Sequence, residues 1–193
     1  MGESRQNPEQ LPKSIQTDEE NRNKGHLKIF FGYAAGVGKT YAMLEAAHMA
    51  KQQGIDVVAG YVEPHACPKT AALLNGLEVL PTREVFYNGM ILDEFDIGMA
   101  LKRKPQLILV DELAHTNAEG CRHAKRYQDI KELLNAGIDV YTTVNVQHIE
   151  SLCDTVASIT EIIVRERIPD SIFDNADQVE LIDIEPQDLI NRL

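Results

Sequence analysis

The chain has 193 residues, of which 44% are hydrophobic and 25% are charged, and its formal net charge is −11 at pH 7. This composition is typical of a globular protein with a sizeable core, and the negative charge argues against general nucleic-acid binding, which requires a positive surface. No apolar run approaches about 18 residues, and the start lacks a secretory leader. We therefore expect a soluble, cytoplasmic protein without direct membrane insertion, whose separated cysteines (Cys67, Cys121 and Cys153) are reduced thiols rather than zinc ligands.

The first predicted elements follow a polar stretch. Residues 1–24 show no sustained periodicity and are expected to form a flexible tail, whereas residues 25–193 are expected to form one domain. The apolar run at 27–31 predicts a buried parallel strand. Apolar positions at helical spacing predict a helix over 39–53, ended by Gly54.

The segment between this strand and this helix is typical of a phosphate-binding loop. Its candidate ligand-binding residues are Gly36, Val37, Gly38, Lys39 and Thr40. Backbone amides at a helix N-terminus bind phosphate, Lys39 would reach the outer phosphates, and the Thr40 hydroxyl would bind Mg²⁺. The usual spacing places the first glycine where this chain has Tyr33, and Gly32, one position earlier, is expected to relieve crowding. We predict that the loop binds ATP with Mg²⁺.

Strands and helices then alternate. We predict a strand over 55–62, a helix over 69–77, and a small appended β element over 77–92, around a proline turn and an Asn-Gly turn. A helix is expected over 93–104, because acidic residues lie at its start and basic residues at its end.

The next strand, 106–112, ends in two carboxylates. Four apolar residues lead directly into Asp111 and Glu112, and ligands of open α/β sheets bind at that end of the strands. Asp111 is expected to hold Mg²⁺, and Glu112 to orient or deprotonate an attacking water or hydroxyl as the catalytic residue.

The remaining predicted elements complete the sheet. After a helix over 124–137, we predict strands over 138–146, 160–168 and 178–184. A helix is expected over 147–159, and a closing helix from Pro186. Strands separated by helices imply parallel crossovers, so the predicted fold class is α/β: a P-loop NTPase-like three-layer sandwich with a mostly parallel sheet.

Several polar residues near the predicted strand ends have more than one interpretation. Asn145, with Gln147 and His148, either senses the γ-phosphate or caps the next helix. Arg122, in the basic run RHAKR, has three interpretations: it stabilises phosphate charge, it binds a partner, or it belongs to a solvated helix face. The same choice between a functional and a structural role is open for three further residues: His115, Glu63 and His65.

Four segments together resemble a known family. The segments KIFFG with GKTYAMLEAA, VDELAHTN, RHAKRYQD and DVYTTVNVQHIESL are similar to the N-terminal cytoplasmic domain of the KdpD potassium-sensor histidine kinases, over about residues 25–193. In this resemblance, Tyr33 replaces a small residue and Cys67 replaces an arginine.

The resemblance implies an ATP-binding regulatory domain of a two-component system that responds to potassium limitation or osmotic stress. Its partners would be histidine-kinase and universal-stress-protein-like domains or other Kdp components, in cis or in trans, and full-length members are anchored in the inner membrane. We expect no histidine-kinase catalytic core within these 193 residues. The alternative is a phosphotransferase, a protein serine kinase or a small-molecule kinase, that uses the same loop and the Asp111–Glu112 pair.

Overall fold

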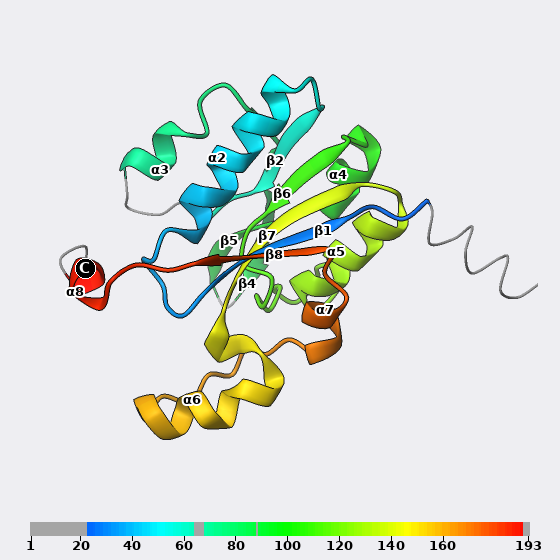
Figure 1. Cartoon of the computed structure of the whole chain (residues 1–193). Helices are drawn as coiled ribbons and strands as arrows, with labels where there is room; N and C mark the ends of the chain where they lie inside the picture. The colour runs from blue at the N-terminus through cyan, green and yellow to red at the C-terminus, as the bar shows by residue number, and fades with distance from the viewer. Residues whose placement is uncertain (1–22, 64–67, 88, 191–193) are drawn as a thin grey trace, which may run out of the picture.

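A single parallel sheet organises the chain (Figure 1). The computed structural model describes residues 23–63, 68–87 and 89–190. The strands of this sheet are β1 (Leu27–Gly32), β2 (Val57–Tyr61), β3 (Glu78–Val79), β6 (Leu107–Val110), β7 (Asp139–Asn145) and β8 (Gln178–Ile182). They lie in the order β3-β2-β6-β7-β1-β8, and every pairing between them is parallel.

Helices cover both faces of the sheet, as Figure 1 shows. The helices are α2 (Lys39–Gln52), α3 (Pro68–Ala72), α4 (Ile97–Arg103), α5 (Arg126–Asn135), α6 (Cys153–Thr160), α7 (Asp170–Asp174) and α8 (Pro186–Ile190). Apolar side chains alternate between the two faces of each strand, so the core has two parts. Phe30 packs with α2 on one face, whereas Ile29 packs with α4 and α5 on the other. The predicted three-layer α/β architecture with a mostly parallel sheet is confirmed.

The appended β element is also confirmed. β4 (Arg83–Tyr87) and β5 (Met90–Glu94) form an antiparallel hairpin, and Gly89 of the Asn-Gly turn has a φ of 84°. The preceding short strand, β3, belongs instead to the main sheet. The helix predicted from residue 93 begins at Ile97, because β5 runs to Glu94 and the Asp96 side chain caps the helix by accepting from the Met99 amide at 2.9 Å.

The predicted strand over 160–168 is wrong. In the described chain, residues 161–167 join no strand, and Ile168 forms one isolated bridge with Ile149. The isoleucines of this segment suggested a strand through their β-propensity, but Ile162 is 64% exposed and Ile163 is 79% exposed. The place beside β1 is taken by β8, so the sheet reaches six strands without this segment.

The segment before α6 also differs from the prediction. The expected helix over 147–159 begins as two short 3-10 helices, η1 (Val146–His148) and η2 (Glu150–Leu152), and becomes α-helical only at Cys153. The short helix α7, after Pro169, was not predicted. Among the residues that the structure describes, no helix has the length and apolarity needed to cross a bilayer.

Candidate functional site

The predicted phosphate loop connects β1 to α2. Gly36 has a φ of 84° and Gly38 a φ of 107°, a left-handed backbone that glycine adopts without strain. Gly32 is required for a different reason: a Cβ there would lie 2.7 Å from Val37 Cγ2 and 3.1 Å from Lys39 Cδ. This close approach confirms that Gly32 relieves crowding at the start of the loop.

Lys39 and Thr40 begin α2 and point into the protein. Each is 8% exposed, and the Lys39 ammonium donates to the carbonyl oxygen of Ala34 at 2.8 Å, across the loop. Burial lowers the pKa of Lys39, although the negative charges of Asp111 and Glu112 partly oppose this shift. The candidate loop therefore holds a partly desolvated cation beside two carboxylates.

Asp111 lies next to this cation, directly after β6, and is fully buried. One carboxylate oxygen, Oδ2, accepts from the Thr40 hydroxyl at 3.0 Å, and the other, Oδ1, accepts from the Thr143 hydroxyl of β7. The Glu63 amide also approaches Oδ2, at 3.4 Å. The two predicted magnesium ligands, Thr40 and Asp111, are thus brought together.

Glu112 turns away from the strand with a φ of 59°, a left-handed conformation that is uncommon for a residue with a side chain. Its amide donates to Asp111 Oδ1 and to Thr143 Oγ1, each at 3.2 Å. Part of Glu112 reaches solvent, but partial burial raises the pKa of its carboxyl group, and the charges of Asp111 and Glu63 raise it further. A carboxyl group with a raised pKa is suited to accept a proton.

Asn145 ends β7, which lies between β1 and β6. It is paired in register with Gly32, the last residue before the loop. Its side-chain oxygen is buried and has no hydrogen-bond partner among the residues that the structure describes, which is rare in folded proteins. Its neighbour His148 has a structural contact, from its Nδ1 to the carbonyl oxygen of Glu166 at 2.8 Å.

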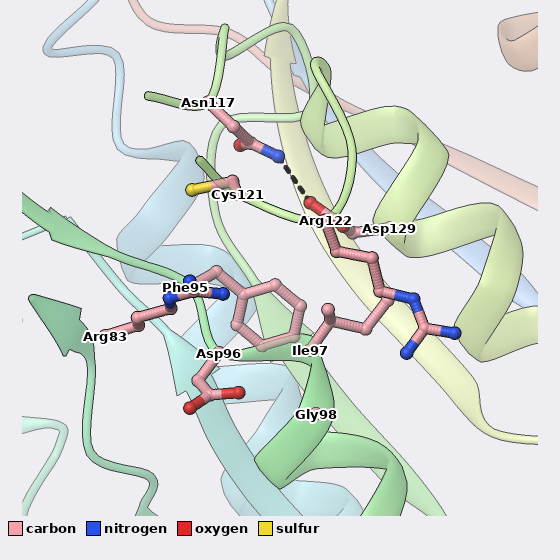
Figure 2. A pocket seen from close by; sticks show the side chains of 9 residues that line it. All are labelled: Arg83, Phe95, Asp96, Ile97, Gly98, Asn117, Cys121, Arg122 and Asp129. Carbon is pink, nitrogen blue, oxygen red and sulfur yellow. Dashed lines mark hydrogen bonds between the residues drawn. The ribbon is translucent and has the colours of Figure 1, made fainter. Parts of the chain in front are cut away.

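Arg122 lies elsewhere, in a small pocket of about 160 Å³ between α4 and α5 (Figure 2). Its guanidinium is paired with Glu132 at 2.5 Å, and about half of the side chain is exposed. Figure 2 shows this guanidinium extending away from the Asn117–Asp129 hydrogen bond. The structure thus places Arg122 beside α4 and α5, where it pairs with Glu132.

The basic run contains a buried residue that the sequence analysis missed. Arg126 is 0% exposed; its Nη2 pairs with Glu94 at 3.1 Å, and its Nη1 donates to the carbonyl oxygen of Asp111 at 3.3 Å. The guanidinium carbon lies 4.1 Å from the centre of the Tyr61 ring, a cation–π distance. Arg126 therefore holds the backbone of Asp111, a predicted metal ligand, through the Asp111 carbonyl oxygen.

The same network includes two residues whose roles were left open. Tyr61 donates its hydroxyl to Glu63 at 2.7 Å; burial and this hydrogen bond raise the pKa of Tyr61. His115 contacts both oxygens of Glu94 at 3.2 Å. His115 and Glu63 thus have structural contacts around the candidate site, whereas His65 and Cys67 lie outside the described residues.

Comparison with known proteins shows the family of the chain. A family model described as the osmosensitive K⁺ channel His kinase sensor domain, KdpD, matches residues 23–193. The sensor protein KdpD of Clostridium acetobutylicum is 62% identical over 188 residues, which is 97% of this chain and 21% of that protein. The sensor protein KdpD of Escherichia coli is 58% identical over 89% of this chain and 19% of its own length.

A third relative, the sensor protein KdpD of Mycobacterium tuberculosis, is 54% identical over 88% of this chain and 20% of that protein. The chain thus spans about a fifth of the length of these relatives. The family model covers residues 23–193, which is nearly all of this chain. The chain therefore belongs to the KdpD family, as an osmosensitive K⁺ channel His kinase sensor domain.

Proposed function

We propose that this domain binds ATP with Mg²⁺ in a P-loop NTPase-like site and that its nucleotide state regulates a sensor kinase. One observation carries the proposal. Thr40 and Asp111, 71 positions apart in the sequence, meet at 3.0 Å beside the buried ammonium of Lys39. A hydroxyl, a carboxylate and a lysine at a helix N-terminus are the groups that hold a nucleotide's phosphates and magnesium in this class of site.

The residues present fit such a ligand. Gly36 and Gly38 adopt positive φ angles and carry no side chains that would obstruct the loop amides, and the missing side chain at Gly32 leaves room for Val37. Thr40 and Asp111 would hold Mg²⁺, which prefers oxygen ligands. The buried side-chain oxygen of Asn145 offers a polar group that would lie near the outer phosphate, as a sensing residue requires. Mg²⁺ would neutralise phosphate charge.

Regulation is the second part of the proposal. The relatives are named sensor proteins, and the family description names a His kinase sensor domain. Because ATP and ADP differ only in the γ-phosphate, contacts from Lys39 and Asn145 that depend on this group would distinguish the two states. The distinction would bias a histidine kinase or another Kdp component, in cis or in trans, under potassium limitation or osmotic stress.

The alternative is a phosphotransferase acting on a protein serine or a small molecule. It is favoured by Glu112, whose raised pKa and position one residue after Asp111 suit a general base. A switch needs only slow turnover, whereas a kinase needs Glu112 for its reaction. Glu112→Gln retains the shape and a hydrogen-bonding oxygen but cannot accept a proton near neutral pH.

Titration calorimetry with ATP, with and without Mg²⁺, tests the binding site. We expect Lys39→Ala to weaken ATP binding at least about 10-fold, because charge-assisted hydrogen bonds to phosphate are lost. Lys131→Ala, at an exposed position on α5, is the matched control and should bind ATP as the unchanged protein does. Equal affinity in all three proteins would refute the assignment.

Turnover of ATP separates the two functions. We expect slow hydrolysis, with ATP binding intact in Glu112→Gln. Phosphoryl transfer at about 1 s⁻¹ or faster that Glu112→Gln abolishes would favour the kinase. A full-length relative carrying the substitution equivalent to Lys39→Ala should lose nucleotide-dependent control of its kinase output.

A further inference from the structure

A second hollow lies beside the first residue of the phosphate loop. β1 and β8 are parallel, with Gly32 opposite Ile182, so the segments that follow them leave the sheet at the same edge. The Tyr33 hydroxyl donates to the carbonyl oxygen of Ile184 at 3.0 Å. Here an open hollow of about 550 Å³ is lined by Tyr33, Asp183, Ile184, Glu185 and Pro186.

The volume and the lining restrict what the hollow can bind. Its size falls within the range of about 300–1,000 Å³ that small-molecule sites occupy. Tyr33, Ile184 and Pro186 contribute apolar surface, and Tyr33 adds an aromatic ring that can pack against a flat ring. Asp183 and Glu185 contribute carboxylates, which accept hydrogen bonds from hydroxyl groups and repel anions. A neutral, partly aromatic group with hydroxyls fits, and a phosphate does not.

The phosphate loop and this hollow have complementary charge. Lys39 brings a cation to the α2 end of the loop, whereas acidic residues line the hollow at the Tyr33 end. A nucleotide has the same division, since its phosphates are anionic and its base and ribose are neutral. The charge pattern therefore matches one orientation of a nucleotide, with its phosphates at the loop and its nucleoside at the hollow.

We propose that this hollow binds the nucleoside part of the nucleotide, with the base packed against Tyr33 and the ribose hydroxyls facing the acidic residues. The inference rests on the proposed function, because the phosphates would occupy the loop from Gly36 to Thr40. The hydrogen bond to Ile184 holds the Tyr33 ring in place before binding. A ring that is already held loses less conformational freedom when a ligand arrives.

Calorimetry with two ligands on the whole chain tests the inference. Inorganic tripolyphosphate with Mg²⁺ measures the loop alone, and ATP with Mg²⁺ measures the loop and the hollow together. We expect ATP to bind about 10-fold tighter or more, and Tyr33→Ala to remove most of this advantage, as loss of base stacking does elsewhere. In Tyr33→Ala, the affinity for tripolyphosphate should stay within about twofold of that of the unchanged protein. Tyr87→Ala, on the β4–β5 hairpin, should change the affinity for neither ligand.

Two further variants make the test specific. Tyr33→Phe keeps the ring and loses only the hydrogen bond, so it should retain most of the advantage of ATP. Asp183→Asn combined with Glu185→Gln should weaken ATP but leave 2′,3′-dideoxy-ATP unchanged, because that nucleotide has no ribose hydroxyls for these residues to bind.

The experiment distinguishes failure of the nucleoside site from failure of the proposed function. If tripolyphosphate and ATP bind equally and both depend on Lys39, the phosphate site stands and the nucleoside site is overturned. The nucleoside site is also overturned if Tyr33→Ala weakens both ligands alike, since Tyr33 would then only shape the loop. If neither ligand binds, the proposed function fails, and this inference fails with it.

Discussion

The two ends of the parallel sheet carry the same kind of ion pair in opposite surroundings. At the amino end, Arg103 donates to both oxygens of Asp56, at 2.8 and 2.7 Å, and to both oxygens of Glu78, at 2.9 and 2.8 Å. These side chains are between 32% and 49% exposed. At the carboxyl end, Arg126 pairs with Glu94, and the two residues are 0% and 3% exposed.

The difference shows what each pair contributes. Exposed pairs remain hydrated and add little to stability. Arg103 therefore mainly connects Asp56, which precedes β2, with Glu78, the first residue of β3. Burying a charge costs free energy that an apolar replacement would avoid, and Asp111, Glu94 and Arg126 are all buried charged residues at one edge. This concentration of buried charge marks the carboxyl edge as the candidate site independently of the glycine-rich loop.

The largest expected effect comes from breaking the buried pair. Arg126→Ala leaves the Glu94 carboxylate buried without its cation and should lower the free energy of unfolding by about 3–5 kcal/mol, measured by urea denaturation. Arg103→Ala, the matched arginine at the amino end, should cost much less, and its cost should shrink in about 1 M salt because exposed charges are screened. Equal losses at the two positions would contradict the comparison.

The second effect concerns the segment that covers the carboxyl end. Ile168 is 0% exposed, whereas Ile163, five positions earlier, is 79% exposed. Ile168→Ala should lower the free energy of unfolding by about 2–5 kcal/mol through the cavity it creates, and Ile163→Ala should change it by less than about 0.5 kcal/mol. Thermal and urea denaturation of both variants check this; a similar loss at Ile163 would mean that it is buried in solution.

The smallest effect is a pH dependence at the amino end. A hydrogen bond with Asp177 and the charge of that carboxylate raise the pKa of His26. The resulting stabilisation is fully present below the unfolded pKa, about 6.5, and disappears as the pH rises through the folded value. The stability difference between the unchanged protein and His26→Ala should therefore decrease from pH 6 to pH 8, and a difference that is constant over this range would exclude the pair as its source.

Asp177 adds the opposite dependence in acid. Burial alone would raise the pKa of its carboxyl group, but the Leu27 amide, which donates to it at 2.7 Å, and the His26 ring lower it. Its contribution is present above the unfolded pKa, 3.8, and is lost as the pH falls through the folded value. Asp177→Asn cannot titrate and also removes the charge beside His26, so it should abolish both the acid and the neutral parts of the pH dependence.

The sequence predicted the carboxyl edge well where local patterns determine structure. An apolar run followed by two carboxylates located β6 and Asp111, and the glycine spacing located the turn into α2. In both cases the signal lies within a few residues. Strand and loop then place the candidate ligands at one edge, because parallel strands end on the same side.

Arg126 and the segment after α6 could not be predicted in this way. Arg126 belongs to a basic run that suggested a solvated helix face, and its burial depends on Glu94, 32 positions earlier. Residues 161–167 have the β-propensity of a strand, but no edge beside β1 was available once β8 had paired with it. Both outcomes are set by contacts between distant parts of the chain.

The position of β8 has a consequence for how the protein forms. β1, which leads into the candidate phosphate loop, is completed on one side by β8, and the Tyr33–Ile184 hydrogen bond joins residues 151 positions apart. On the ribosome, the loop is made early but its neighbouring strand emerges only after more than a hundred further residues. Contacts of such sequence separation form slowly, so a nascent chain exposes an unpaired β1 edge until β8 has been made.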